Sequence, residues 1–255
     1  MKKVIAIIGS ARKKATFHAV QKFEENLKLW TDIDFEYIFL HKYHLEFCKG
    51  CLACLDYGEH LCSLEDDRDK LFEKMDQADG VILASPNYAF QVSARMKNFL
   101  DRFAYFYHRP YFWGKTFTAI ITQGVFGGDK IRKYLQTMGK NFGFNVTKGT
   151  CVKTLDPMTA QQERKLEKKI HKAAKRFHKQ LEQAKNPKPS LFRLMMFRMS
   201  RNFIQKLDPK YRDYHYYKEQ GWFESDYYFE TSLGFFKRLM GRFFDFMGRI
   251  MAKHQ

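Results

Sequence analysis

Short apolar runs alternate with longer segments of helical period through most of this chain, and this alternation constrains the fold more than any other feature. Residues 3–10 (KVIAIIGS) and 80–85 (GVILAS) are near-continuous apolar runs, the pattern of strands buried on both faces. We predict further strands at residues 35–40, 117–122 and 145–152, and helices at residues 16–30, from about 66, 92–105, 129–140 and from 158 to about 185. This order predicts an α/β fold with a parallel sheet covered on both faces.

Two of these helices carry start signals. Ser63 is a candidate cap for the second helix, and Asp66 and Asp67 place negative charge at its positive end. Thr159 and Gln162 have the spacing of a capping box at the start of the fifth helix. The apolar residues of the fifth helix fall on one stripe, so its many charges form a solvated face: Leu166, Ile170, Ala174, Phe177 and Leu181.

The positive charge is concentrated toward the C-terminus. Residues 1–150 carry 22 Lys and Arg against 17 Asp and Glu, and residues 151–255 carry 23 against 11, so the net charge of +17 divides into +5 and +12. The first apolar stretch is too short for a signal peptide, and no run approaches the ~18 apolar residues of a membrane span. We therefore expect a cytoplasmic protein, in which clustered cysteines indicate metal or redox use.

Ligands of parallel α/β sheets bind outside the carboxyl ends of the strands, which here are followed by loops at residues 10–16, 85–91 and 123–129. The first loop offers backbone N–H groups, the hydroxyls of Ser10 and Thr16, and the cations Arg12, Lys13 and Lys14 at a helix N-terminus. These groups favour an anion, so we interpret the loop as a phosphate site, with a solvated turn as the alternative. The loop has neither the Walker spacing nor the Gly-x-Gly-x-x-Gly fingerprint.

Three motifs together resemble one family: GSARKKAT (9–16), SPNYAFQVSARMKNFLDR (85–102) and TQGVFGG (122–128). They are similar to the NADPH-dependent FMN reductase-like branch of the flavodoxin-like superfamily, which includes iron-sulfur flavoproteins. The resemblance covers residues 1–180. It implies a flavodoxin-like doubly wound, five-stranded parallel sheet of order 2-1-3-4-5 within a domain of residues 1–185.

The same resemblance implies how FMN is held. Ser10, Arg12 and Thr16 would bind the phosphate, while the loops after the third and fourth strands would line the isoalloxazine ring. The residues expected at the cofactor are Ser10, Arg12, Thr16, Ser85, Pro86, Asn87, Tyr88, Gln123 and Gly124. The chain departs from the family at Ala11, where proline is usual. We assign Lys97, Asp101 and Arg102 to stabilisation of their helix.

Four of the five cysteines lie within CKGCLACLDYGEHLC (48–62), spaced Cys-x2-Cys-x2-Cys-x7-Cys. The resemblance makes a [4Fe-4S] cluster on Cys48, Cys51, Cys54 and Cys62 one interpretation, since closely spaced thiolates ligate such clusters. The alternative is a loop that holds no metal, because cluster-free relatives keep a similar pattern. Zinc fits less well, since its sites pair two knuckles across a longer stretch. Cys151 stands apart and is predicted to be an inert core thiol.

Residues 186–255 form a basic, aromatic-rich extension after the NPKPS linker (186–190). Residues 191–206 and 231–253 have the pattern of amphipathic helices, with arginines among Phe, Met and Leu. The extension packs on the first domain or a second subunit, lies on an anionic membrane, or binds nucleic acid. We favour packing, because aromatic and Met enrichment is typical of buried interfaces, and no nucleic-acid-binding fold accompanies the charge.

The sequence and the resemblance lead to one functional hypothesis. We expect a cytoplasmic, homo-oligomeric flavoprotein that takes a hydride from NADPH or NADH onto N5 of FMN and passes electrons to an unidentified acceptor. No side chain is assigned as an acid or base. The alternatives are an iron-sulfur electron carrier, and a non-enzymatic module that uses the basic extension on a membrane or nucleic acid.

Overall fold

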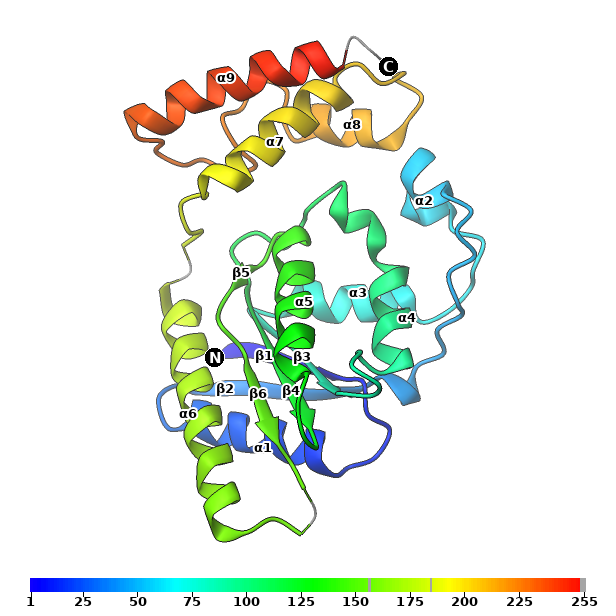
Figure 1. Ribbon diagram of the computed structural model, residues 1–255. Coiled ribbons are helices and arrows are strands. Elements are labelled where there is room, and N and C mark those ends of the chain that lie inside the picture. Colours follow the sequence, from blue (N-terminus) through cyan, green and yellow to red (C-terminus); the bar gives the residue numbers. More distant parts are fainter. Residues whose placement is uncertain (156, 184, 253–255) are drawn as a thin grey trace. The chain divides into compact units, whose positions relative to one another are not determined.

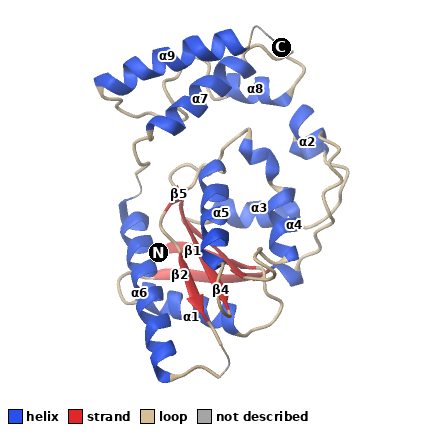
Figure 2. Ribbon diagram, in the orientation of Figure 1, coloured by secondary structure: helices blue, strands red, loops and turns tan. Residues whose placement is uncertain are grey.

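The protein was analysed as a computed structural model that describes residues 1–155, 157–183 and 185–252. The described residues divide into two compact units (Figures 1 and 2). The first contains residues 1–49 and 64–185, and the second contains residues 50–63 and the described part of 186–255. The cysteine-bearing segment after Lys49 is thus grouped with the extension, whereas the sequence analysis assigned it to residues 1–185. The assignment of residues 1–185 and 186–255 to separate domains stays a prediction.

The first unit is built on a parallel sheet in the order β2-β1-β3-β4-β5, with β6 also paired to β4. Ala6 of β1 pairs with Tyr37 of β2 on one side and with Ile82 of β3 on the other. This arrangement confirms the predicted flavodoxin-like order 2-1-3-4-5. The strands are β1 (Lys2–Ile8), β2 (Ile33–Phe39), β3 (Gly80–Pro86), β4 (Thr116–Gln123), β5 (Asn145–Val146) and β6 (Thr150–Lys153).

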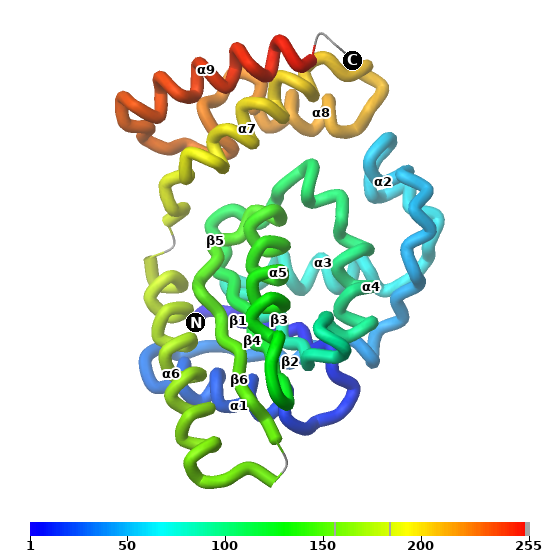
Figure 3. Tube along the Cα trace, in the orientation of Figure 1, coloured from blue at the N-terminus to red at the C-terminus, as the bar shows by residue number. Residues whose placement is uncertain are grey.

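The predicted fifth strand, residues 145–152, is divided into β5 and β6, which are labelled at successive positions along the Cα trace in Figure 3. Gly149 lies in the interruption, against the backbone of β4. A Cβ at Gly149 would lie 2.1 Å from the carbonyl oxygen of Ala119, so only glycine lets the chain pass this close. Both short strands still pair with β4 and thus continue the same edge of the sheet.

Helices cover both faces of this sheet, with α1 and α6 on one face and α3, α4 and α5 on the other (Figure 1). Alternate residues of β1, such as Ala6 and Ile8, belong to the core under α1 and α6, where the rings of Phe23 and Phe177 meet 5.6 Å apart. The helices are α1 (Ala15–Lys28), α3 (Arg68–Gln77), α4 (Ala94–Arg102), α5 (Gly128–Asn141) and α6 (Ala160–Gln183).

Of the two predicted helix starts, the capping box is confirmed and the Ser63 cap is wrong. Thr159 and Gln162 exchange capping hydrogen bonds of 2.8 and 3.3 Å, which confirms the capping box of α6, and its predicted apolar stripe is buried. Ser63 is not the cap of α3, because that helix starts one turn later, after Asp67. Asp66 instead accepts the backbone N–H of Arg68 at 3.1 Å.

The second unit has a helical core of its own. It contains α2 (Ala53–Asp56), α7 (Leu191–Ile204), α8 (Arg212–Glu219) and α9 (Phe235–Met251). The predicted amphipathic helices correspond to α7 and α9, which pack together, whereas α8 was not predicted. Aromatic and aliphatic side chains form the core: Leu194, Phe197, Ile204, Tyr217, Trp222, Tyr227 and Leu233.

Buried charges also join α7 to α9. Asp245 of α9 accepts hydrogen bonds from Arg198, Arg201 and Asn202 of α7, and Arg198 also reaches Asp226. Desolvation lowers the pKa of Arg201, and the charge of Asp245 opposes that change. Because a buried charge is costly unless it is paired, this network fixes how the two helices meet.

Candidate functional site

Three loops of the first unit meet at the carboxyl edge of β1, β3 and β4 and enclose a recess of about 200 Å³. The first contributes the N-terminal turn of α1, the second follows β3, and the third follows β4. The residues that line the recess are Ser10, Arg12, Lys14, Ala15, Thr16, Pro86, Asn87, Tyr88, Thr122, Gln123, Gly124 and Thr154.

The first loop presents an open helix N-terminus to this recess. In the described part of the chain, Lys14 occupies the cap position of α1 without a side-chain hydrogen bond, and the first turn contains no acidic residue. The hydroxyl of Ser10 donates to the carbonyl of Arg12 at 2.9 Å and so closes the loop. The N–H groups of the first turn and two exposed cations, Arg12 and Lys14, therefore favour an anion here.

A buried hydrogen bond ties this helix end to the neighbouring strand. The hydroxyls of Thr16 in α1 and Thr122 in β4 lie 2.7 Å apart, and both residues are 3% exposed. Thr122 also accepts the backbone N–H of Asn87 at its carbonyl oxygen, at 2.7 Å. One residue of β4 thus links the first and second loops.

The second loop turns sharply over the recess. Tyr88 and Gln91 exchange backbone hydrogen bonds of 3.0 and 2.9 Å around Ala89 and Phe90, whose φ angles are +47° and +64°. Left-handed backbone costs a non-glycine residue roughly 1–2 kcal/mol. Strain of this kind is concentrated at binding sites, where the surrounding structure enforces it.

Asn87 carries a polar atom that has no partner. Its amide nitrogen donates to the carbonyl of Phe126 at 2.9 Å, which leaves Oδ1 buried and without a hydrogen-bond partner among the described residues. A buried acceptor costs free energy unless a donor reaches it. Because Asn87 lines the recess, a ligand with an N–H or O–H group at this position would remove that cost.

The third loop is shaped by glycines. The side-chain oxygen of Gln123 accepts the backbone N–H of Gly128 at 2.6 Å, and Gly127 has a φ of +95°. A Cβ at Gly128 would lie 2.4 Å from the sulfur of Cys151, so this turn rests directly on that thiol. Burial raises the pKa of Cys151 to about 11, which agrees with the prediction of an inert core thiol.

Exposed aromatic side chains form a rim beside the recess. Phe90 and Phe126 are 57% and 66% exposed, and their rings lie 5.3 Å apart. Tyr88, which lines the recess, is 50% exposed. Exposed rings next to a recess of this kind can stack on a planar molecule.

The recess brings together eight of the nine residues that the sequence analysis expected at a cofactor; Ser85 does not line it. Ser85 is fully buried and binds inward: its hydroxyl donates to the carbonyl of Pro86 and accepts the N–H of Ser93. The structure adds four lining residues: Lys14, Ala15, Thr122 and Thr154. Lys14, Ala15 and Thr122 stand within the quoted motifs, whereas no sequence signal indicated Thr154.

The cysteine-bearing segment is not arranged as a metal site. Cys48 and Cys51 are exposed, and Cys54 and Cys62 are half-buried. Across residues 1–155, 157–183 and 185–252, no group of three or more His, Cys, Asp or Glu side chains is placed to hold a metal ion. Cys51, Cys54 and Cys62, which belong to the same unit, are not gathered as ligands, so the thiols as arranged do not fit a [4Fe-4S] cluster.

Asp66 and Asp67 anchor the chain on both sides of this segment. Asp66 accepts the N–H of Glu46 at 2.9 Å, and Asp67 accepts the N–H of His44 at 2.8 Å. The guanidinium of Arg102 donates to both oxygens of Asp66 at 2.9 Å, and both side chains are almost fully buried. Lys97 and Asp101 form an ion pair along α4, the helix that they were expected to stabilise, whereas Arg102 reaches out of that helix to Asp66, just before α3.

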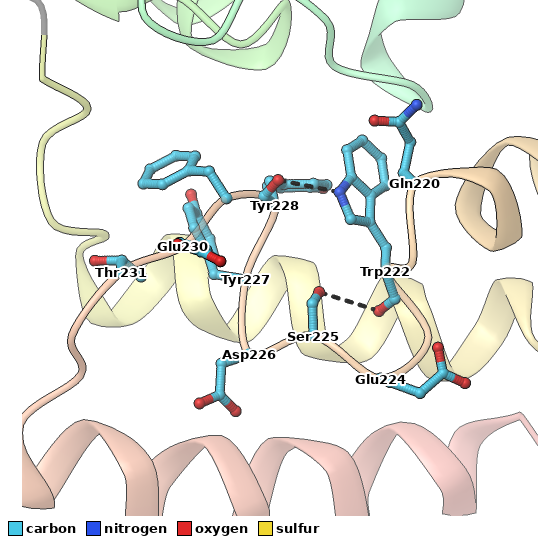
Figure 4. Close-up of a pocket in the computed structure, with 10 residues that line it drawn as sticks. Gln220, Trp222, Glu224, Ser225, Asp226, Tyr227, Tyr228, Glu230 and Thr231 are labelled. Atoms are coloured by element: carbon cyan, nitrogen blue, oxygen red, sulfur yellow. Dashed lines mark hydrogen bonds between the residues drawn. The ribbon is translucent and has the colours of Figure 1, made fainter.

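A second recess, of about 640 Å³, lies in the second unit and is lined by residues from Gln220 to Thr231 (Figure 4). The indole N–H of Trp222 donates to the carbonyl of Tyr228 at 3.0 Å, and the hydroxyl of Ser225 donates to the carbonyl of Trp222 at 3.3 Å. Burial raises the pKa of Tyr228 to about 12. Trp222 and Tyr227 belong to the core of the unit, so packing accounts for this aromatic cluster.

Comparisons with known proteins agree with the geometry of the first unit. The family model for NADPH-dependent FMN reductase matches residues 2–154. An iron-sulfur flavoprotein from Archaeoglobus fulgidus is 35% identical over 144 residues, which is 55% of this chain and 64% of that protein. One from Clostridioides difficile is 28% identical over 190 residues, or 72% of this chain and 81% of that protein. The chain thus spans less than two thirds of the A. fulgidus relative.

Solved structures show the same fold. An azoreductase from Bacillus anthracis covers 70% of this chain and all of its own, with a TM-score of 0.53 and 15% identity. RosB, solved with the bound intermediate 8-demethyl-8-formylriboflavin-5'-phosphate, covers 92% of both chains with a TM-score of 0.55 and 12% identity. These likenesses confirm the flavodoxin-like fold.

Proposed function

Because the chain belongs to the NADPH-dependent FMN reductase family, we propose that it is an FMN-dependent oxidoreductase that takes a hydride from NADPH or NADH and passes electrons to a separate acceptor. The observation that carries this proposal is the open N-terminus of α1 at a recess whose other walls are the loops after β3 and β4. The N-terminus of α1 is suited to bind an anion, and the recess beside it lies at the carboxyl ends of the parallel strands, where ligands bind in sheets of this kind.

The phosphate of FMN fits the first loop. The N–H groups of the first turn of α1 are its hydrogen-bond donors, and Arg12 and Lys14 supply positive charge. To donate to the phosphate as well, the hydroxyl of Ser10 would turn away from the carbonyl of Arg12, and the hydroxyl of Thr16 would be the acceptor in its bond with Thr122. Charge-assisted hydrogen bonds to a dianion are stronger than those between neutral groups. Lys13 is excluded from this role, because its ammonium lies 5.8 Å from the ring centres of Phe17 and Phe39 and the residue does not line the recess.

The ring of the cofactor fits the second and third loops. Asn87 offers its unpartnered Oδ1 to a ring N–H, and Gly124 leaves room beside the loop, since a Cβ there would meet only Cδ2 of Leu155, at 3.9 Å. Bound FMN would supply a ring system that accepts a hydride from the nicotinamide and releases electrons to the acceptor. The chain itself orients this ring, and the strained turn at Ala89 and Phe90 fixes the wall against which it rests.

The described lining residues include no Asp, Glu, His or Cys. The chain therefore contributes position and electrostatics, and the proposal needs no acid or base from a side chain. The exposed rings of Tyr88, Phe90 and Phe126 form the surface on which the planar nicotinamide and the acceptor bind in turn.

Cofactor binding tests the first half of this proposal. We expect the intact protein to bind FMN at least tenfold more tightly than riboflavin, because riboflavin lacks the phosphate that the first loop binds. Equal affinities for FMN and riboflavin would show that the first loop does not bind the phosphate. With FMN bound, the protein should oxidise NADPH or NADH when artificial acceptors such as quinones are supplied, and its mass in solution tests the predicted homo-oligomer.

The second candidate function is an iron-sulfur electron carrier. It is favoured by the spacing of Cys48, Cys51, Cys54 and Cys62 and by the printed names of the A. fulgidus and C. difficile relatives. A cluster would require these thiols to be arranged differently from the structure, in which they do not form a ligand set. Iron and sulfide analysis of protein purified without oxygen separates the two candidates.

A further inference from the structure

One face of α9 is apolar along its whole length and exposed. We call this face the α9 stripe. The exposed fractions of its residues range from 36% at Met247 to 85% at Phe235. With 3.6 residues per turn, its members fill about 120° of the helix circumference. They are Phe235, Phe236, Leu239, Phe243, Phe246, Met247 and Ile250.

The opposite face of α9 holds the helix in its unit. Gly241, Phe244, Asp245 and Gly248 are buried there. A Cβ at Gly248 would lie 3.2 Å from the Cα of Met199, so the backbones of α7 and α9 approach closely along this face. The core of the unit is therefore formed without the α9 stripe, whose exposed apolar surface needs another explanation.

The exposed arginines of α9 and its buried aspartate lie on different parts of the helix surface. Arg238, Arg242 and Arg249 are exposed and fall in one row along the edge of the α9 stripe, which we call the arginine row. The acidic residue of α9, Asp245, is 6% exposed and accepts hydrogen bonds from Arg198 and Arg201. The exposed charge of this helix is consequently all positive.

A second row of exposed apolar side chains lies on α7. Phe192, Met196 and Phe203 are 66%, 48% and 40% exposed and share one face of that helix with Met199. Met199 lies beside Gly248 of α9, so this row of α7 adjoins α9. The second unit thus exposes two apolar rows, and the row of α7 lies beside the face of α9 that is opposite the α9 stripe.

We propose that the α9 stripe and the arginine row bind the surface of an anionic lipid bilayer, with α9 parallel to the membrane plane. Phenylalanine, leucine, isoleucine and methionine would enter the boundary between head groups and acyl chains, and the arginines would reach lipid phosphates at its edge. No described helix is long and apolar enough to span a bilayer, so the contact would be peripheral.

Charge complementarity favours lipid over a second copy of this chain. The α9 stripe and its arginine edge carry no exposed acidic side chain within the described residues. Two copies that met stripe to stripe would leave both arginine rows without counter-charges, and would place the rows side by side if the two helices ran antiparallel, which is unfavourable. Anionic head groups supply those charges at the same depth as the arginines.

Flotation of the FMN-bound full-length protein with vesicles tests the proposal. We expect binding to vesicles of phosphatidylcholine with phosphatidylglycerol, and at least tenfold weaker binding to phosphatidylcholine alone. Phe243→Glu with Phe246→Glu should reduce binding more than tenfold, because charge is costly in the apolar layer. Phe243→Ser with Phe246→Ser should weaken it in the same direction.

Two double variants with the same change in charge distinguish binding through α9 from attraction of the whole basic protein to anionic vesicles. Arg242→Glu with Arg249→Glu should reduce binding more than tenfold, whereas Lys172→Glu with Lys175→Glu on the exposed face of α6 should leave it within twofold. Equal losses in both pairs, or no binding to anionic vesicles, would overturn the proposal. It would also fail if the stripe variants changed the molecular mass in solution but not vesicle binding, since the stripe would then join copies of the chain.

Discussion

The hydroxyls of Thr16 and Thr122 share a buried hydrogen bond of 2.7 Å across 106 residues of sequence. Thr16 stands in the first turn of α1 and Thr122 near the end of β4, so this bond fixes the spacing between the proposed phosphate loop and the proposed ring loops. One of the two hydroxyls donates and the other accepts, and both residues are almost fully buried.

Replacing Thr122 with Val should leave the hydroxyl of Thr16 unpaired. We expect the free energy of unfolding to fall by about 1–3 kcal/mol, measured by denaturant titration. Thr16→Val should cost a similar amount, and the double variant should cost less than the sum, because neither hydroxyl is then left alone. Strictly additive losses would show that the two hydroxyls do not interact.

Arg12 and Lys13 offer a matched test of the phosphate loop. Arg12→Glu places a negative charge beside the dianionic phosphate, so FMN affinity should fall tenfold or more, which corresponds to about 1.4 kcal/mol or more. Lys13→Glu makes the same change in charge at a residue that does not line the recess, and its effect should be at most a few-fold. Calorimetric titration measures both, and equal losses would count against the assigned role of Arg12.

Asp66 and Arg102 form the buried ion pair that anchors the chain beside the cysteines. Asp66→Asn removes the charge that accepts two hydrogen bonds from the buried guanidinium, so we expect a loss of about 3–5 kcal/mol in the free energy of unfolding. Asp101→Asn, which breaks the exposed pair with Lys97, should cost less than about 1 kcal/mol. Comparable losses in the two variants would mean that burial does not govern the strength of the Asp66 pair.

Cys151 makes stability depend on pH in the alkaline range. Its thiol has a pKa of about 11 in the folded protein and 9.0 as its ordinary value. Between these values the folded state holds a proton that the unfolded state has lost, so the free energy of unfolding decreases as pH rises from about 9 to 11. The loss attributable to this thiol is on the order of 2 kcal/mol.

The control for this pH effect is Cys151→Ala. Other groups titrate in the same range, so the informative quantity is the difference in pH slope between the variant and the wild type. The variant should lose stability less steeply above pH ~9. Parallel slopes in the two proteins would show that Cys151 does not titrate differently on folding.

The four clustered cysteines decide between the two candidate functions. If the segment holds no metal, protein reconstituted with iron and sulfide without oxygen should retain no bound iron after desalting, as the arrangement of its thiols implies. Stoichiometric iron and sulfide that are lost in Cys51→Ser but kept in Cys151→Ser would establish the iron-sulfur alternative instead.

The sheet was largely predictable from the sequence because a strand buried on both faces is a near-continuous apolar run. The strand predicted at residues 80–85 is β3, Gly80–Pro86. The break between β5 and β6 was missed because it depends on the approach of Gly149 to Ala119, thirty residues earlier. The helix predicted from about residue 66 is α3, which begins at Arg68, but Ser63 was wrongly assigned as its cap because Asp66 binds Arg102 and the backbone N–H of Arg68 next to the helix start.

The position of the candidate site followed from the sheet, since loops at the carboxyl ends of parallel strands must meet. Its individual contacts did not follow. Ser85 belongs to a loop motif, yet its hydroxyl binds the start of α4 through Ser93. Thr154 reaches the recess only because β6 pairs with β4, a pairing that no local pattern specifies.

Reduction of the FMN-bound protein by NADPH in the absence of oxygen tests the central claim most directly. When the FMN-bound protein is mixed with NADPH in a stopped-flow instrument, the bound flavin should lose the visible absorbance of its oxidised form. The rate of this loss should saturate as the NADPH concentration rises, because the nicotinamide must first bind beside the ring. The reduced protein should regain that absorbance when a quinone acceptor is added. A bound flavin that NADPH and NADH both leave oxidised, or a protein that binds no FMN, would contradict the proposed function.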